Sequence, residues 1–347
     1  MNRLMGFREV QMVAVCDVVP EHRQRARVRV NRHYRNNDCR AYSDYRELLE
    51  RPDIDAVLIG TPDHWHAIIT IEACKQGKDV YCEKPESLTV REGREMVNAV
   101  RRYGRVFSGG SQRVLGDYGN WPGLIWSGAL GEVREVFVSC GGPSGDCYLP
   151  EQPIPRGVDW NMWLGPVPYR PFHGSLIRGG FRPYRDYSGG GMTDWGVHRF
   201  GAALFAIGKH LTGPTRILPP SERNRRYLTF EFADGTRMYH GGTRNITYVG
   251  TEGRLPGRYR TPASRAEMPT YQGRGGIFGD FVHCVKTRER PFRDVEIAHR
   301  ACTVCHPGNI AYGLNRPLRW DPEREEIIGD REATRWLNRP KREPWTL

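Results

Sequence analysis

Residues 56–82 have the sequence AVLIGTPDHWHAIITIEACKQGKDVYC, and this stretch decides the fold. The apolar run Ala56–Gly60 predicts a buried strand, which must stop at Thr61-Pro62 because proline cannot donate to a strand ladder. A helix is predicted over His66–Gln76 and a second buried strand over Lys78–Cys82. A strand, a crossover helix and a second strand form the repeating unit of a parallel sheet. Such a sheet binds ligands at the carboxyl ends of its strands.

The same alternation extends from this unit in both directions. Gln11–Asp17 predicts another strand, and Val90–Tyr103 predicts another helix. The polar segment Pro20–Asn31 is compatible with a helix, and a short helix is expected over Tyr45–Glu50. We therefore expect an α/β fold class in which residues 1–107 form a Rossmann-type, dinucleotide-binding-like domain.

Asp17 ends the first of these strands. In a dinucleotide-binding fold an acid at this place binds the adenosine ribose, about 20 residues after a glycine-rich turn that holds the diphosphate. Gly6 is the single glycine before Asp17, so the sequence predicts an incomplete sheet without its first strand and glycine-rich loop. Two explanations stay open: the chain begins at an internal methionine of a longer protein, or the protein lacks the loop. In either case we expect the chain as given to bind NAD weakly or not at all.

Composition narrows the class of protein. An apolar content of 38% with 11% aromatic residues supports packed cores, and no run of eighteen apolar residues or signal peptide is visible. A cytoplasmic protein without a membrane partner is expected. The net charge of +12 comes almost entirely from arginines that are scattered along the chain without a nucleic-acid motif. A solvated basic surface is therefore favoured over nucleic-acid binding, with an anionic sugar as a further use for some arginines.

The nine cysteines are scattered and odd in number, which favours free thiols in a reducing compartment. CTVCH at residues 302–306 fits the c-type haem attachment pattern. Haem attachment takes place outside the cytoplasm, and residues 297–314 predict a helix, so no haem is expected. No second cysteine pair stands at the spacing of a structural zinc site.

Several motifs are more specific than this pattern. The strongest are GTPDHWH at residues 60–66 and GKDVYCEKP at residues 77–85. Others are DWGVH at 194–198, DWNMWLGP at 159–166, PFH at 171–173, GGSQR at 109–113, RWDP at 319–322 and REPW at 342–345. Together they resemble the Gfo/Idh/MocA oxidoreductase family, and in particular its glycoside-handling branch, over nearly the whole chain.

This resemblance implies the architecture and partners of the remaining chain. Residues 108–347 are expected to form a sugar-binding and oligomerisation α+β domain with a large open, mostly antiparallel sheet. Residues 133–139 and 227–232 have strand patterns that agree with it. A small-molecule sugar or glycoside is the expected partner, and the chain is expected to be a homo-oligomer.

The resemblance also places catalysis on Lys84, Asp194 and His198. In the family the EKP lysine lies beside the nicotinamide and the reacting sugar carbon, and the motif histidine is the usual acid/base. Asp194 and His198 stand four residues apart, so a single helix would put them on one face. A helix N-cap is the alternative role for Asp194. Gly201 occupies the place of the motif's last acid, which removes a charge partner for His198.

The cofactor implied by the resemblance is NAD(P), with Asp17, Thr61, Pro62, His66 and Glu83 as its expected contacts. The candidates for substrate binding are Gln112, Trp160, Trp163 and His173. Aromatic faces pack on the apolar faces of sugar rings, although core packing is the alternative for the two tryptophans. A metal held by Asp194, His198 and a further histidine is less favoured, and no metal site is predicted.

Three functions remain open. The preferred hypothesis is a glycosidase-like enzyme that cleaves glycosides without net redox, with Lys84, Asp194 and His198 sharing the proton transfers. The second is an NAD(P)-dependent sugar dehydrogenase whose true start lies upstream. The third is a non-catalytic sugar-binding relative. Gly201 and the missing glycine-rich loop favour the first and third hypotheses over the second.

Overall fold

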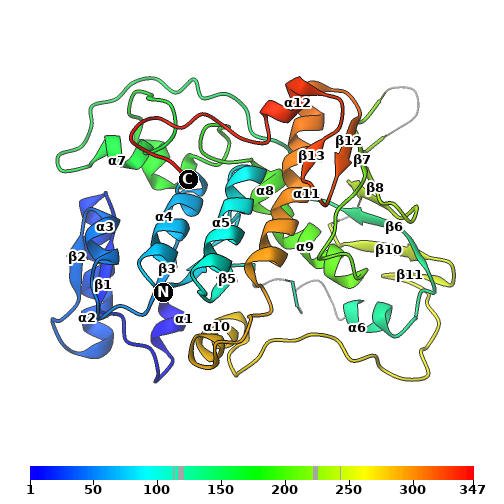
Figure 1. Ribbon diagram of the computed structural model, residues 1–347, viewed down its shortest axis with the longest axis horizontal. Helices are drawn as coiled ribbons and strands as arrows, with labels where there is room; N and C mark the ends of the chain where they lie inside the picture. Colours follow the sequence, from blue (N-terminus) through cyan, green and yellow to red (C-terminus); the bar gives the residue numbers. More distant parts are fainter. Residues whose placement is uncertain (112–113, 116–120, 222–225, 243) are drawn as a thin grey trace.

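The computed structural model describes residues 1–111, 114–115, 121–221, 226–242 and 244–347. These residues form three β-sheets (Figure 1). Two are small and parallel, with the strand orders β1-β2 and β3-β4-β5. The third has eight strands in the order β11-β10-β6-β9-β8-β7-β12-β13, and its pairings are antiparallel except for β6 with β9. The predicted fold class, a Rossmann-like parallel part followed by a large mostly antiparallel sheet, is confirmed.

The strands of the two parallel sheets are β1 (Ala14–Cys16), β2 (Arg40–Tyr42), β3 (Ala56–Ile59), β4 (Asp79–Cys82) and β5 (Phe107–Gly109). The strands of the large sheet are β6 (Val133–Val138), β7 (Arg216–Leu218), β8 (Leu228–Glu231), β9 (Arg237–His240), β10 (Thr247–Gly250), β11 (Gly253–Leu255), β12 (Leu318–Asp321) and β13 (Glu326–Ile327). The helices of the first part are α1 (Asn2–Met5), α2 (Pro20–Tyr34), α3 (Tyr45–Leu49), α4 (Asp63–Lys75) and α5 (Val90–Arg102). The later helices are α6 (Trp121–Trp126), α7 (Trp160–Leu164), the π-helical turn η1 (Leu176–Gly180), α8 (Gly191–Asp194), α9 (Gly196–Ala206), α10 (Gly276–Thr287), α11 (Val295–Leu314) and α12 (Arg331–Arg335).

Strand β4 is buried on both faces, as the apolar run predicts. Val80 and Cys82 belong to the core formed with α4 and α5. Tyr81, between them, packs on the opposite face against Phe278 and Phe281 of α10. Successive side chains of a strand point to opposite faces, so one strand joins two cores. A helix from late in the sequence therefore completes a sheet from its first third.

Helix α11 joins the two parts of the molecule. It packs against α5 on one side and against α9 and β7 on the other, and Figure 1 shows it in orange between the parallel strands and the large sheet. Val295 and Ala298 lie in the core of the parallel sheet, whereas Ala301 and Val304 lie in the core of the large sheet. The CTVCH motif at residues 302–306 is buried within this helix.

The expected start of one helix needs correction. The helix predicted from His66 begins at Asp63, because Pro62 serves as the N-cap residue and an acid suits the first turn of a helix. As a result Asp63 lies inside the fold with 3% exposure. The predicted domain limit at residue 107 falls in β5, and α10 and α11 both pack on the first part. That limit stays a prediction.

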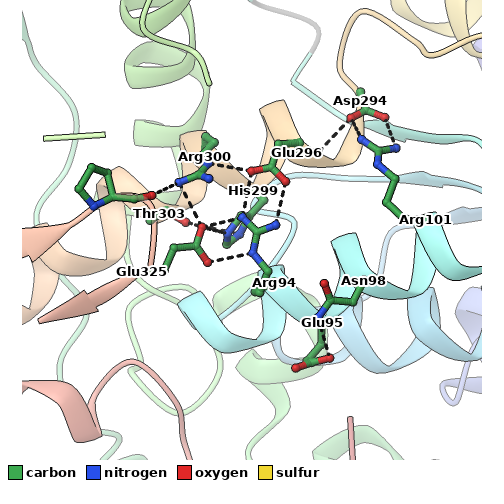
Figure 2. Close-up of polar contacts among 11 residues, drawn as sticks. Arg94, Glu95, Asn98, Arg101, Asp294, Glu296, His299, Arg300, Thr303 and Glu325 are labelled. Carbon is green, nitrogen blue, oxygen red and sulfur yellow. Dashed lines mark hydrogen bonds and ion pairs between the residues drawn. The ribbon is translucent and has the colours of Figure 1, made fainter. Parts of the chain in front are cut away.

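A charged network fixes α5, α11 and the turn between β12 and β13 to one another (Figure 2). The guanidinium of Arg94 donates to both carboxylate oxygens of Glu296, at 2.8 and 2.9 Å, and to both of Glu325, at 3.0 and 2.7 Å. His299 Nε2 lies 2.7 Å from Glu325 Oε1, and Arg300 Nε donates to Glu296 at 2.8 Å. Burial opposes ionisation of Glu325, but the hydrogen bonds of His299 and Arg94 outweigh it and lower the pKa of Glu325 to about 2.

Candidate functional site

The structure brings Lys84 and Asp194 together. Lys84 follows the carboxyl end of β4, and Asp194 is the last residue of α8. The Lys84 ammonium donates to Asp194 Oδ1 at 2.5 Å and to the Asp194 carbonyl oxygen at 2.9 Å. Each side chain is 16% exposed, so the pair is largely shielded and still reachable from solvent. The contact links the carboxyl end of β4 to α8, which begins in the Gly-rich segment at residues 189–191.

Arg182 adds a second cation to this pair. Its Nε donates to Asp194 Oδ1 at 3.1 Å. Burial opposes ionisation of Asp194, but Lys84 and then Arg182 outweigh it and lower the pKa of that carboxyl. Asp194 is therefore an ionised hydrogen-bond acceptor at neutral pH and holds the lysine in place.

Asp63 is a second acid near this pair, and it is not among the residues that the sequence singles out. Burial raises its pKa to about 7, while Ser188 and the charge of Arg182 lower it. Its Oδ2 has no hydrogen-bond partner among the described residues. The sequence signal for Asp63 is the TPD tripeptide, in which the acid follows the proline that starts the helix.

Two histidines of α4 connect these elements. His66 lies between two loops, with Nδ1 2.8 Å from the Pro85 carbonyl oxygen and Nε2 2.8 Å from the Thr61 carbonyl oxygen. Burial lowers the pKa of His66, which the two carbonyl oxygens oppose. His64 Nε2 lies 2.9 Å from the Trp163 carbonyl oxygen, and its ring contacts Tyr187 at 5.6 Å. The first turn of α4 is thus attached both to the Lys84 turn and to the segment before α8.

His198 is buried behind the pair. Its Nδ1 lies 2.7 Å from Ser111 Oγ. The expectation that Asp194 and His198 share one helix is wrong: α8 ends at Asp194 and α9 begins at Gly196, so Trp195 separates the two helices.

Gly201, the position at which the sequence lacks the motif acid, faces a buried arginine. A Cβ at Gly201 would lie 3.4 Å from the Ala301 Cβ and 3.5 Å from Arg293 Nη1. Arg293 is 1% exposed and lies 3.8 Å from Glu86. A buried arginine with Glu86 beside it therefore lies next to Gly201, and no spacing in the sequence indicates it.

The expected cofactor contacts lie at carboxyl ends of parallel strands. Asp17 follows β1, where its carboxylate is 36% exposed and accepts from the Val19 backbone at 2.8 Å. Thr61 and Pro62 follow β3, and Glu83 follows β4 beside Gly110. The hydroxyl of Thr61 is buried without a partner in the described parts of the chain. A carboxylate and a free hydroxyl at these ends fit the ribose and nicotinamide parts of a dinucleotide.

The expected substrate contacts are more dispersed. Trp160 and Trp163 are 3% and 5% exposed and stack on each other at 4.7 Å within a separate core. His173 Nδ1 lies 2.7 Å from Ser175 Oγ, and Gln112 lies outside the described residues. The structure supports core packing for the two tryptophans, and their contact with a sugar stays a prediction.

Two further findings concern the described residues alone. They contain no cluster of three histidine, cysteine, aspartate or glutamate side chains that would hold a metal ion. A helix of the length and apolar character required to cross a bilayer is not found among them.

Comparison with known proteins identifies the family. Residues 2–111 match the Gfo/Idh/MocA oxidoreductase family's NAD-binding Rossmann fold, and residues 141–347 match its C-terminal alpha/beta domain. The chain belongs to the Gfo/Idh/MocA oxidoreductase family. The recognised motifs are therefore those of an oxidoreductase family with an NAD-binding domain.

Individual members of the family give finer comparisons. The chain is 44% identical over 171 residues to an uncharacterized oxidoreductase, YrbE, of Bacillus subtilis, a match of 49% of this chain and 40% of the relative. It is 39% identical over 105 residues to a glycosyl hydrolase family 109 protein of a Shewanella species, a match of 27% of this chain and 21% of the relative. The chain thus spans less than half the length of either curated relative. The fold is similar to that of myo-inositol 2-dehydrogenase from Lactobacillus plantarum, with a TM-score of 0.63, 16% identity and coverage of 92% and 94% of the two chains.

Proposed function

We propose that the chain is a nicotinamide-dependent oxidoreductase that acts on a hydroxyl-bearing carbon of a sugar or polyol. The observation that carries the proposal is the contact of Lys84 with Asp194 at the carboxyl end of β4. This edge of the parallel sheet also holds Thr61 and Glu83. Proton-transferring groups and cofactor-binding groups therefore meet at one place. The glycosidase-like function that the sequence favours has weaker support, since the family and its Rossmann domain are those of oxidoreductases.

Asp17, Thr61 and Glu83 would hold the cofactor, as their positions after β1, β3 and β4 favour. A bound nicotinamide accepts or donates a hydride at the substrate carbon. The residues of the chain must then manage the hydroxyl proton, because oxidation of an alcohol to a carbonyl releases one proton with each hydride.

Lys84 is the residue we place at the substrate oxygen. Its ammonium has two acceptors on Asp194, which fix the direction of the side chain and leave a third N–H for a substrate hydroxyl. Asp194 stays ionised because Lys84 and Arg182 lower its pKa. The arrangement stabilises negative charge that develops on the substrate oxygen when its proton leaves.

A sugar or polyol is the substrate class that the comparisons favour. The structural neighbour named above is a myo-inositol dehydrogenase, and the Shewanella relative is named a glycosyl hydrolase. Both names point to molecules rich in hydroxyl groups. Arg182 and Lys84 place positive charge at the site, which also suits the carboxylate of a sugar acid.

Purified chain should be mixed with NAD⁺ or NADP⁺ and a panel of polyols, aldoses and sugar acids, and cofactor reduction followed by absorbance. The residues before Asp17 contain no glycine-rich turn for the diphosphate, so the affinity for the cofactor should be low and the cofactor is supplied at high concentration. We expect reduction with at least one substrate under these conditions, and its loss in Lys84→Met. Lys75→Met, an exposed lysine at the end of α4, is the matched control. Failure of every substrate to reduce either cofactor, with the folded protein confirmed by circular dichroism, would contradict the proposal.

A second function is favoured by the identity with the family 109 glycosyl hydrolase. Lys84 and Asp194 would then transfer protons at a glycosidic oxygen and release a free sugar without net redox. Nitrophenyl glycosides added to the same panel separate the two functions. Release of nitrophenol without net reduction of the cofactor would support this second function over the first.

A further inference from the structure

The carboxyl group of Asp63 is enclosed by the elements that build the Lys84–Asp194 pair. Asp63 starts α4 directly after Pro62 and is 3% exposed. In the same turn His66 contacts the Pro85 carbonyl oxygen, which directly follows Lys84. His64 contacts Tyr187, which directly precedes Ser188. These two contacts hold Asp63 between the Lys84 turn and the segment that leads into α8.

The segment at Ser188 has little room to move away from Asp63. A Cβ at Gly190 would lie 2.5 Å from the Ser144 backbone nitrogen, and one at Gly191 would lie 2.5 Å from the Gly141 Cα. The Ser144 hydroxyl donates to the Ser188 carbonyl oxygen at 2.7 Å, and Asn309 Nδ2 donates to the Gly189 carbonyl oxygen at 2.8 Å. The surroundings of Asp63 are therefore tightly packed, and its Oδ2 has no hydrogen-bond partner among the described residues.

The groups that act on the Asp63 carboxyl come from each element around it. They are the Ser188 hydroxyl, the cations of Arg182 and Lys84, and the carboxylate of Asp194. Arg182, Lys84 and ionised Asp194 carry a net charge of about +1 in their ordinary states. An ionised Asp63 would make the group neutral, so proton uptake at Asp63 and proton loss at Lys84 are linked through charge.

We propose that Asp63 is a buried proton-binding residue of the proton-transfer site, whose carboxyl takes up a proton when Lys84 loses its charge and releases it when Lys84 is charged. This rests on the proposed function for its role in turnover, but the proton linkage itself does not require turnover. Burial of the carboxyl, its free Oδ2 and the nearby cations together make Asp63 the acid that changes charge in this group. Asp194 cannot take that role because its cationic partners keep it ionised.

The direct test is carboxyl NMR on the full chain labelled with ¹³C at aspartate Cγ, with Asp63→Asn to assign the signal. We expect a titration midpoint near neutral pH, in agreement with the raised pKa of about 7. Lys84→Met removes a cation and should move the midpoint upward by about half a pH unit. Ser188→Ala removes a hydrogen-bond donor and should move it in the same direction. A midpoint near 4, or one that neither variant moves, overturns the proposal.

The pH dependence of activity supplies an independent test. The kcat/KM of the wild-type chain for its substrate should show a limb near neutral pH that Asp63→Asn abolishes. Asp53→Asn, the same change at an exposed carboxylate, is the matched control and should keep the limb. An unchanged neutral limb in folded Asp63→Asn overturns the proposal. Absence of turnover in all variants, together with a midpoint near 7 that Lys84→Met moves, contradicts the proposed function and supports the linkage.

Discussion

Two largely buried charge groups among the described residues differ in how completely their atoms are satisfied. In the network of Arg94, Glu296 and Glu325, the central guanidinium meets two carboxylates through four hydrogen bonds (Figure 2). Around Lys84 and Asp194, in contrast, Asp63 Oδ2 and Thr61 Oγ1 are buried without a partner in the described residues. A buried polar atom without a partner costs about 1–3 kcal/mol. A ligand that hydrogen-bonds to these atoms would remove this free-energy cost.

The difference teaches how to separate structural charges from functional ones. Glu325 has a lowered pKa because hydrogen bonds to His299 and Arg94 outweigh its burial. Asp63 has a raised pKa because its burial outweighs Ser188 and Arg182. The first group stabilises the folded state, whereas the second is held in a state that costs free energy. Substitutions in the two groups should therefore have opposite effects on stability and activity.

The largest effect is expected at Lys84. Lys84→Met should reduce kcat/KM by about 10²–10⁴-fold, because a group that moves or stabilises a proton contributes this much to the rate. Because Arg182 still donates to Asp194, the midpoint of urea unfolding should change less than it does in a variant of Arg94. Kinetics with the best substrate of the panel and urea unfolding by fluorescence measure the two quantities. A variant that retains most of its activity would show that Lys84 lies outside the reaction.

Arg94 should show the reverse pattern. Arg94→Met removes the shared cation of Glu325, which is 6% exposed, and of the partly exposed Glu296. Because Arg300 still contacts both carboxylates, the free energy of unfolding should fall by about 1.5–3 kcal/mol, the contribution of hydrogen bonds to charged groups. The rate per folded molecule should stay near that of the wild type. Arg91→Met, three residues earlier on α5, is the matched control, because its side chain is 59% exposed. Equal losses in the two variants would show that the network adds nothing to a surface ion pair.

The pH dependence of stability should have opposite signs in the two groups. The pKa of Asp63 is raised to about 7 from an unfolded value of 3.8, so the folded state binds the proton more tightly. Stability from this group is present below about 3.8 and is lost as pH rises through about 7. The free energy of unfolding of Asp63→Asn, relative to that of the wild type, should therefore rise by about 2–4 kcal/mol from acid to alkaline pH. Urea unfolding from pH 4 to pH 8 checks this, and a constant difference between the two proteins would contradict it.

Glu325 supplies the contrast in acid. Its pKa is lowered to about 2 from an unfolded value of 4.5, so its stabilisation is present above about 4.5 and is lost as pH falls through about 2. Glu325→Gln should destabilise the protein by about 1–3 kcal/mol at neutral pH and approach the wild type at the acid end. Acid unfolding followed by circular dichroism measures both proteins. A gap that persists below pH 2 would show that the loss is one of packing.

The smallest effect is expected for the exposed pair of Arg91 and Glu95, which lies on the same helix as Arg94. Solvent-exposed ion pairs at this spacing contribute about 0.3–0.5 kcal/mol. A double-mutant cycle with Arg91→Met and Glu95→Gln should give a coupling energy in this range that decreases with salt. A coupling energy above 1 kcal/mol would show that solvent screens the end of α5 less than the exposure of Arg91 indicates.

Much of the fold could be predicted because it depends on local patterns. The strand at Ala56–Ile59, the helix from Val90 and the contact region of Lys84 follow from apolar runs, glycines and two short motifs. The apolar periodicity of an element and the residue types of its turns depend on positions a few residues apart, so they can be recognised in a single sequence. The same is true of Asp194, which belongs to a motif with a recognisable spacing.

The missed features depend on residues that are distant in sequence. Arg94, Glu296 and Glu325 come from three separate elements, and only the i,i+4 pair of Glu296 with Arg300 has a local signature. Asp63 was missed because the helix was expected to begin at His66, which left the acid in an exposed turn. Pro62 moves the helix start by three residues and carries Asp63 into the interior. A small boundary error thus concealed a buried acid near the site whose pKa is raised.

The packing of Tyr81 has a consequence for synthesis of the protein. Its ring is fully buried against Phe278 and Phe281 of α10, which leave the ribosome long after β4. A nascent chain that ends before α10 exposes this aromatic face, together with Val106 beside it. Exposed apolar faces on parallel strands promote aggregation and recruit chaperones. The parallel sheet therefore becomes complete only when the last quarter of the chain has been made, although its strands are the first to be translated.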